Sequence, residues 1–190
     1  MEEYSHIKTV IAMILSLSVA VLLRGTVRFV QHPGRLKIYW VHLAWVFYLF
    51  LLLLHFWWWE IYLRTIQQWY FTEYFFVIMY ILLFYILASM LYPDDLRDHK
   101  EDFQVYFYSR KKWFFAILAS TYLFDFVDTL IKGEAYYRHY TWEYPVRNMT
   151  HFILCLVAIR VNNKRFQEVL VVGFILYELL YIFRLFLKEG

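Results

Sequence analysis

The sequence contains little of the material from which disulfide scaffolds and flexible linkers are made. Among its 190 residues there are one cysteine, three prolines and five glycines. The single Cys155 excludes an intramolecular disulfide and any cysteine-based zinc motif. Because so little proline and glycine is present, a long linker is not expected, and we predict one domain over residues 1–190.

Signatures of catalysis and of nucleic-acid binding are missing as well. The chain has no phosphate-binding loop, no G-x-S-x-G and no H-E-x-x-H motif, so no enzyme class is indicated. The net charge of +3 is small and gives no reason to expect a nucleic-acid partner. The N-terminal residues lack the basic region and cleavage site of a signal peptide, so we expect the first helix to be retained.

Apolar and aromatic residues are what the chain has in excess, at 62% and 24% of the sequence. Three runs carry no formal charge: 22 residues at Ile38–Trp59, 20 at Tyr74–Pro93 and 15 at Thr9–Leu23. A helix of about 20 residues crosses the roughly 30 Å hydrocarbon core of a bilayer. A soluble domain of this size has no room to bury several such helices. The sequence therefore predicts an all-α, polytopic integral membrane protein in contact with the lipid bilayer.

Six transmembrane helices are expected from the apolar runs and from the turn signals between them. The breaks are His32-Pro33-Gly34, Pro93-Asp94-Asp95, Gly133, Pro145 and Asn162-Asn163. The fifth helix is the weakest, with 12 uncharged residues from Asn148 to Ile159. The expected helices span residues 7–31, 36–62, 70–93, 112–132, 145–162 and 166–187, with one short amphipathic segment before the fourth.

The distribution of lysine and arginine predicts the orientation. Six spans bring both termini to one side, and the other side, which holds three of the loops, has 12 of the 19 basic residues. By the positive-inside rule those loops are cytoplasmic, so both termini are expected outside the cytoplasm, in a bacterial inner membrane. Aromatic clusters such as Phe56–Trp59 and Trp69–Phe71 then lie on the outer face, where they are expected to form an interfacial belt.

Asp94–Lys112 is the one sizeable cytoplasmic segment in this arrangement. Asp94, Asp95 and Asp98 form a D-D-x-x-D pattern that resembles the motif with which membrane prenyltransferases hold Mg²⁺ and diphosphate. Such enzymes need a second acidic motif at the same membrane face, and here Asp125-x-x-Asp128 falls at the opposite face. A solvated amphipathic helix, with Arg97 and Lys100 beside the acids, is therefore favoured.

Ionisable residues within the expected spans are the strongest indication of a site, because a charge in the bilayer is costly and normally faces a partner or a cavity. Counting residues from the helix ends brings them to a similar depth in the outer half of the membrane. We name five of them the polar layer: Asp125, Asp128, Arg147, His151 and Glu178. The second helix adds His42, His55 and Glu60.

Three interpretations of the polar layer remain open. In the first, the charges pair and only hold helices together, Arg147 with Asp125 or Asp128, and Arg184 with Glu178 or Glu60. In the second, the layer lines a water-accessible path for a proton, a cation or a small polar solute.

The third interpretation is a b-type haem or a divalent metal. His42 and His55 are 13 residues apart, which resembles the spacing in membrane ferric reductases and related cytochromes. On an ideal helix, however, this spacing leaves the two rings about 140° apart, and a paired set on a second helix is missing. Only His55 and His151 match in depth as a single ligand pair.

The second interpretation is our working hypothesis: a small membrane transporter or channel, or a subunit of one, with no resident cofactor. An accessory subunit without transport of its own is the first alternative, and the haem or metal protein is the second. Since 190 residues is small for a self-sufficient transporter, a homo-oligomer or a larger membrane complex is expected.

Overall fold

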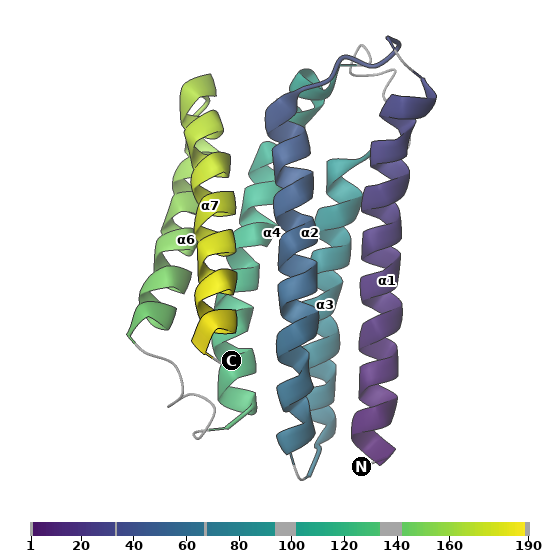
Figure 1. Cartoon of the computed structure of the whole chain (residues 1–190), viewed down its shortest axis with the longest axis vertical. Helices are drawn as coiled ribbons and strands as arrows, with labels where there is room; N and C mark the ends of the chain where they lie inside the picture. Colours follow the sequence, from purple (N-terminus) through teal and green to yellow (C-terminus); the bar gives the residue numbers. More distant parts are fainter. Residues whose placement is uncertain (1, 33, 67, 94–101, 134–141, 189–190) are drawn as a thin grey trace.

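The computed structural model describes residues 2–32, 34–66, 68–93, 102–133 and 142–188. These residues form helices and connecting turns, with no named strand among them. Successive α-helices run in alternating directions, so both chain ends lie at the same end of the bundle (Figure 1). We call this end the terminal half and the other end the opposite half. The elements are α1 (Glu2–Gln31), α2 (Trp40–Trp59), the 3₁₀-helix η1 (Glu60–Thr65), α3 (Phe71–Leu91), α4 (Phe103–Ile131), α6 (Glu143–Arg160) and α7 (Lys164–Lys188).

Among the described residues, five helices are long and apolar enough to cross a membrane, which agrees with a polytopic membrane protein but is one fewer than the six expected spans. They are α1, α2 continued by η1, α3, α4 and most of α7. The exception is α6, whose 18 residues include three charged ones, Glu143, Arg147 and Arg160. It packs along α4 in the antiparallel direction, beside the other spans (Figure 1).

The start of α4 differs most from the sequence expectation. This helix begins at Phe103, nine residues before the expected residue 112. The reason is a helix cap: the Asp102 side chain accepts hydrogen bonds from the backbone N–H groups of Gln104, at 2.8 Å, and Val105, at 3.4 Å. The expected amphipathic segment thus supplies the first turns of α4, while its D-D-x-x-D pattern lies outside the described residues.

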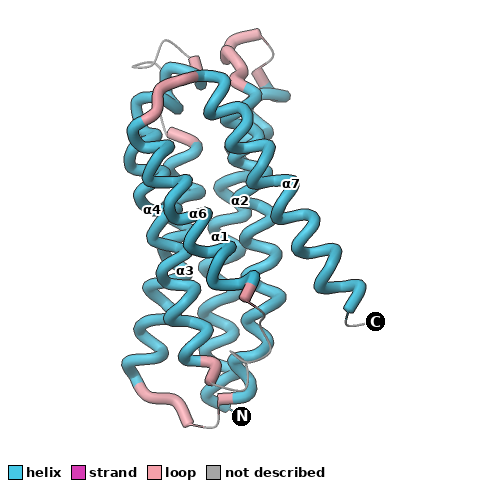
Figure 2. Tube along the Cα trace, turned by 90° about the vertical axis from the view of Figure 1, so that its left-hand side faces the viewer, coloured by secondary structure: helices cyan, strands magenta, loops and turns pink. Residues whose placement is uncertain are grey.

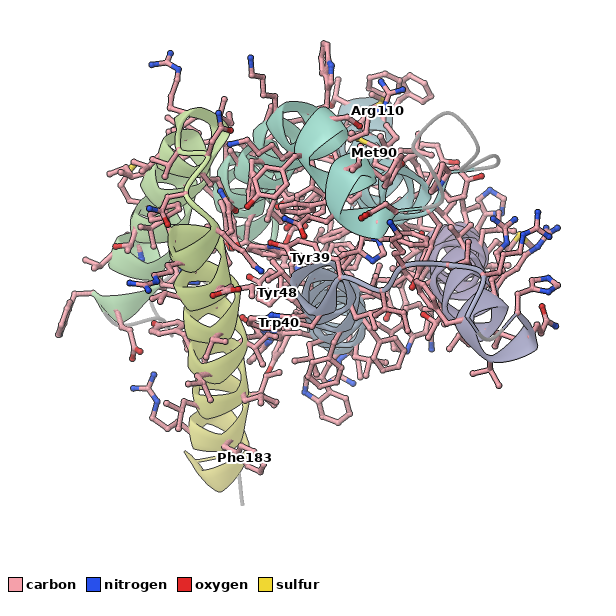
Figure 3. All side chains as sticks on the ribbon, turned by 90° about the horizontal axis from the view of Figure 1, so that it is seen from above. Tyr39, Trp40, Tyr48, Met90, Arg110 and Phe183 are labelled. Carbon is pink, nitrogen blue, oxygen red and sulfur yellow. The ribbon has the colours of Figure 1, made fainter. Side chains whose placement is uncertain are left out.

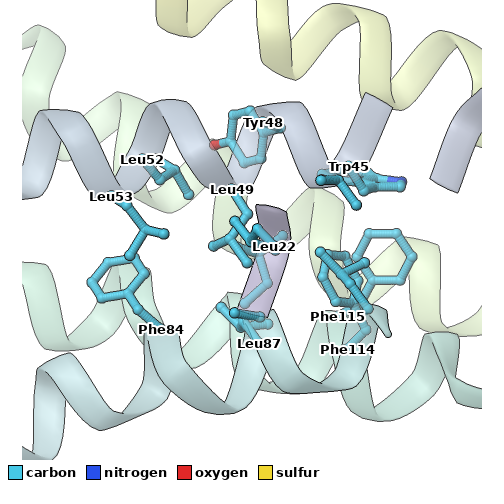
Figure 4. Packing of buried hydrophobic residues seen from close by; sticks show 14 of the residues in the cluster. Leu22, Trp45, Tyr48, Leu49, Leu52, Leu53, Phe84, Leu87, Phe114 and Phe115 are labelled. Atoms are coloured by element: carbon cyan, nitrogen blue, oxygen red, sulfur yellow. The ribbon is translucent and has the colours of Figure 1, made fainter. Parts of the chain in front are cut away.

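Helix α2 lies in the middle of the bundle, in contact with α1, α3, α4 and α7 (Figure 3). Its Trp45 is fully buried and makes edge-to-face ring contacts with Phe114, Phe115 and Phe174 at centroid distances of 5.2 to 5.5 Å. Figure 4 shows this aromatic group together with the leucines that fill the layers beside it. Burial of such large rings makes the middle of the bundle a packed core rather than an open channel.

Polar side chains in the opposite half bond mainly to backbone carbonyls at helix ends. Lys111 donates to the carbonyls of Ala158, at 2.9 Å, and Val161, at 2.7 Å, where α6 ends. His42 hydrogen-bonds the Leu91 carbonyl at the end of α3, at 2.6 Å. These carbonyls have no partner within their own helix, so the side chains act as caps.

Candidate functional site

A buried ion network joins η1 to the end of α4 in the terminal half. The Lys132 ammonium lies 2.5 Å from Asp128 Oδ2, one turn earlier on the chain, and 2.8 Å from Glu60 Oε1. All three side chains are at least 90% buried. Burial alone would lower the pKa of Lys132, which follows the last residue of α4, but the two carboxylates outweigh this and raise it. Lys132 is therefore held as a cation shared by two acids.

A second network joins α2, α6 and α7. The His55 Nδ1–H donates to Glu178 Oε1, and Arg147 Nη2 lies 3.8 Å from the other oxygen of the same carboxylate. Glu178 has no exposed surface. The guanidinium also stacks over the Tyr181 ring, 4.4 Å from its centroid. Three helices are thus tied together through one fully buried carboxylate.

Asp125 differs from the other acids because its described partners are neutral. Its Oδ2 accepts from Asn148 Nδ2 at 2.6 Å, and its Oδ1 accepts from the Tyr80 hydroxyl at 3.3 Å. The backbone carbonyl of Asp125 accepts from the Tyr144 hydroxyl at 2.9 Å. The carboxylate is half-buried between α3, α4 and α6, and among the described residues it forms no ion pair.

His151 is fixed in one ring orientation. Its Nδ1–H donates to the Arg147 carbonyl at 2.8 Å, and its ring packs on Tyr122, Phe174 and Tyr177. With Nδ1 carrying the proton, Nε2 keeps its lone pair and is the nitrogen that can accept a proton or a hydrogen bond.

The two networks and Asp125 surround a small cavity. The volume open to the centres of water-sized molecules is about 60 Å³. Since one water needs about 10–15 Å³ of such volume, the cavity has room for water. Among the residues that line the cavity, three buried polar atoms make no hydrogen bond to any described residue: Glu60 Oε2, Asp128 Oδ1 and Arg147 Nε. All three residues line the cavity, so water or a small ion inside it would satisfy them. The ionisable residues of its lining are His55, Glu60, Asp125, Asp128, Lys132 and Arg147, with Tyr80, Tyr144 and Tyr181 beside them.

Among the described residues, the carboxylates at and beside the cavity outnumber the lysines and arginines. Three carboxylates line it, at Glu60, Asp125 and Asp128, and Glu178 lies beside it, in contact with His55 and Arg147. The two basic side chains of the lining are Lys132 and Arg147. With all six ionised, two negative charges are left over, and a protonated His55 would neutralise one of them. A buried excess of charge is costly unless a proton or another charge compensates it.

The structure brings Asp125, Asp128, Arg147 and Glu178 into one region of the bundle but corrects their partners, and it places His151 in a separate cleft between α6 and α7. Arg147 pairs with Glu178, so its expected pairing with Asp125 or Asp128 was wrong. Arg184 bonds to Glu143, at 2.5 and 3.3 Å, so its expected pairing with Glu178 or Glu60 was wrong as well. The error for Arg147 arises because depth along a helix can be counted from the sequence, whereas the rotation of each helix about its axis cannot. Arg184 and Glu178 lie on one helix, where six positions put their side chains about 120° apart.

Lys132 and Asn148 were missed by the sequence reasoning, although they hold Asp128 and Asp125. Lys132 is the last residue of the expected helix 112–132, and it was counted only as one of the basic residues of the outer side. The signal that identifies it is its position four residues after Asp128, on the same helix face. Asn148 carries no charge and so did not stand out among the polar residues of α6.

The two histidines of the haem alternative line different spaces. His55 lines the small cavity, whereas His151 lines a cleft between α6 and α7. Across the described residues, no group of three or more histidine, cysteine, aspartate or glutamate side chains has the arrangement of a metal site. The haem prediction itself is left to absorption spectroscopy.

Compared with protein-family models, with curated proteins and with solved structures, the chain matches none. The function is therefore argued from the site alone.

Proposed function

We propose that the protein is a small membrane transporter or channel, or a subunit of one, in which the cavity of the terminal half takes up a proton or a small cation. The observation that carries this proposal is the uncompensated negative charge around a cavity with room for water. A layer that served only to hold helices together would be most stable with its charges matched. The excess of carboxylates supports cation or proton uptake, not anion uptake.

Within this proposal Asp125 is the residue that exchanges the ion. The other acids of this region are held by Lys132, Arg147 or His55, while the partners of the Asp125 carboxylate among the described residues are the neutral Asn148 and Tyr80. A carboxylate without a fixed cation can gain and lose a proton or a metal cation without breaking an ion pair.

The arrangement in the membrane belongs to the proposal too. We take α6 as a sixth span, since it packs along α4 and its Asn148 and His151 side chains are buried against protein. The basic loops then lie in the cytoplasm of a bacterial cell and both termini outside it. Reporters that are active only in the cytoplasm should give no signal when fused to either terminus. A signal from one terminus alone would mean an odd number of spans, and α6 would then not cross the membrane.

The decisive experiment measures ion flux into proteoliposomes under a pH gradient or a cation gradient. We expect flux from the wild-type protein and its loss in Asp125→Asn, which removes the exchanging charge and keeps the side-chain size. The matched control is Glu168→Gln, which removes an acid from the exposed Lys164–Glu168 pair in the opposite half. Flux that survives in Asp125→Asn would refute the role of this residue.

A structural subunit without transport is the second candidate. It is supported by the pairing of both basic side chains of the cavity lining, Lys132 and Arg147, with buried carboxylates. No flux under any gradient, together with stable association with another membrane protein, would favour this candidate. A purified protein with a Soret band that is lost in His55→Ala or His151→Ala would instead favour the haem alternative.

A further inference from the structure

A second and larger space lies between α6 and α7. It measures about 680 Å³, within the roughly 300–1,000 Å³ of typical ligand sites. The space exists because α6 packs on α4 whereas α7 packs on α2. Figure 2 shows the C-terminal part of α7 leaning away from the rest of the bundle. We call this space the α6–α7 cleft.

The α6–α7 cleft has charged side chains at one end and is mostly apolar along the rest of its length, where Thr150 and His151 also line it. Glu143, Arg147 and Arg184 lie at its end in the terminal half, and Phe166 and Val169 lie toward the opposite half. Along α7, the 18 positions between Phe166 and Arg184 correspond to about 27 Å of helix. This exceeds the thickness of one leaflet, about half of a 30 Å hydrocarbon core. The cleft is thus long enough for a lipid that stands in one leaflet, and its polarity changes along its length as that of a lipid does.

The polar end favours an anionic head group. Its lining carries two arginines, Arg147 and Arg184, against one carboxylate, Glu143, while Arg147 also pairs with Glu178, which does not line the cleft. The Arg184 side chain is 51% exposed, so it can contact a head group while it bonds to Glu143. Arg147 is buried, its Nε has no partner among the described residues, and its ion pair with Glu178 is long, at 3.8 Å. Guanidinium groups bind phosphate through paired N–H donors.

We propose that an anionic phospholipid of the surrounding bilayer occupies the α6–α7 cleft. One acyl chain lies along the apolar part, and the phosphate contacts Arg184 and reaches toward Arg147. The proposal does not rest on ion transport and holds equally for a structural subunit. It does connect the two spaces, because Arg147 lines both the α6–α7 cleft and the small cavity. A phosphate on Arg147 would draw the guanidinium away from Glu178.

Gly173 makes this proposal testable without disturbing the charges. It lines the α6–α7 cleft, and a Cβ atom built on it meets nothing within 4 Å. Gly173→Leu therefore places a larger side chain in the apolar part of the cleft, with open space around its Cβ atom. Gly173→Ala is the matched control, because it shares most of the gain in helix propensity and leaves the cleft open.

The experiment is native mass spectrometry of the full chain, titrated with phosphatidylglycerol, phosphatidylcholine or oleate. We expect the wild-type protein and Gly173→Ala to bind phosphatidylglycerol about tenfold more tightly than phosphatidylcholine, as expected for one charge-assisted contact. Gly173→Leu should lose binding of both phospholipids. Arg184→Gln, at an exposed position that the fold does not require, should bind both phospholipids equally.

Several outcomes would overturn the proposal. One is equal binding of the two phospholipids by the wild-type protein, and a related one is binding that Gly173→Leu leaves unchanged. Another is binding of oleate but not of phosphatidylglycerol, which would make a free fatty acid the occupant. The last is a wild-type dimer that Gly173→Leu dissociates, which would make a second copy of the chain the occupant.

Discussion

The two halves of the bundle use polar side chains in different ways. In the opposite half, Lys111, His42 and Arg28 bond to backbone carbonyls where helices or turns end, with Arg28 Nη1 lying 3.0 Å from the Pro93 carbonyl. In the terminal half, side chains bond to one another across helices, as Lys132 does to Glu60.

This difference separates structural bonds from bonds suited to function. A carbonyl at a helix end is a fixed acceptor that every fold must satisfy, and a side chain that caps it has one state. A carboxylate can be ionised, protonated or bound to a cation, so a network of carboxylates has several states of similar free energy. We therefore expect substitutions in the opposite half to affect stability alone.

The largest expected effect is that of Lys132→Met. It leaves Glu60 and Asp128 buried without their shared cation, which should lower the free energy of unfolding by about 3–5 kcal/mol. Lys111→Met in the opposite half removes one of two donors to the Ala158 and Val161 carbonyls, because Gln167 Nε2 also donates to them, so it should cost only about 0.5–1.5 kcal/mol. Thermal and denaturant unfolding in detergent would measure both.

Two further measurements sharpen the comparison of these lysines. Adding Glu60→Gln and Asp128→Asn to Lys132→Met should recover much of the stability, because no uncompensated charge remains. The loss in Lys132→Met should also shrink as the pH falls, since protonated carboxylates need no cation. Equal losses for Lys132→Met and Lys111→Met at every pH would contradict the distinction between the halves.

A smaller effect is expected for the pair of Arg147 and Glu178. A double-mutant cycle with Arg147→Gln and Glu178→Gln should give a coupling energy of about 1–3 kcal/mol, since both side chains are buried. The same cycle for Arg184 and Glu143, which are partly exposed, should give about 0.2–1 kcal/mol. Couplings of equal size would show that burial does not set the strength of these pairs.

Much of the fold could be predicted from the sequence because the membrane restricts it strongly. A run of about 20 apolar residues has one stable form in a bilayer, a helix that spans it. The start of α4 was harder to place, because Asp102 caps a helix whose first turns carry Arg110, Lys111 and Lys112. Three basic residues in a row are typical of a cytoplasmic loop. Lys111 can nevertheless lie inside the bundle, because it bonds to backbone carbonyls at the end of α6.

The candidate site was predictable in depth but not in its contacts. Counting from the helix ends grouped Asp125, Arg147 and Glu178 at one level, and the structure has them around one region. Which of them touch depends on the rotation of each helix about its own axis. Successive side chains on a helix are about 100° apart, so a change in rotation brings a different side chain to face the neighbouring helix. Arg147 therefore pairs with Glu178 on α7, although Asp125 lies at a similar depth on α4.

The smallest effect on stability is expected for Asp125→Asn, and it tests the terminal half most directly. The asparagine oxygen can still accept from Asn148, and its amide group can donate to the Tyr80 hydroxyl, so both hydrogen bonds have a neutral replacement. The substitution also removes one negative charge from a layer that has too many. We expect the free energy of unfolding to fall by less than about 1 kcal/mol, or to rise.

Asn148→Ala is the matched comparison, because it removes the shortest hydrogen bond of the Asp125 carboxylate and should destabilise by about 1–3 kcal/mol. If Asp125→Asn instead melts as early as Lys132→Met, Asp125 is a charge on which the fold depends. The terminal half would then differ from the opposite half only in the chemistry of its bonds, not in having a group that is free to exchange an ion.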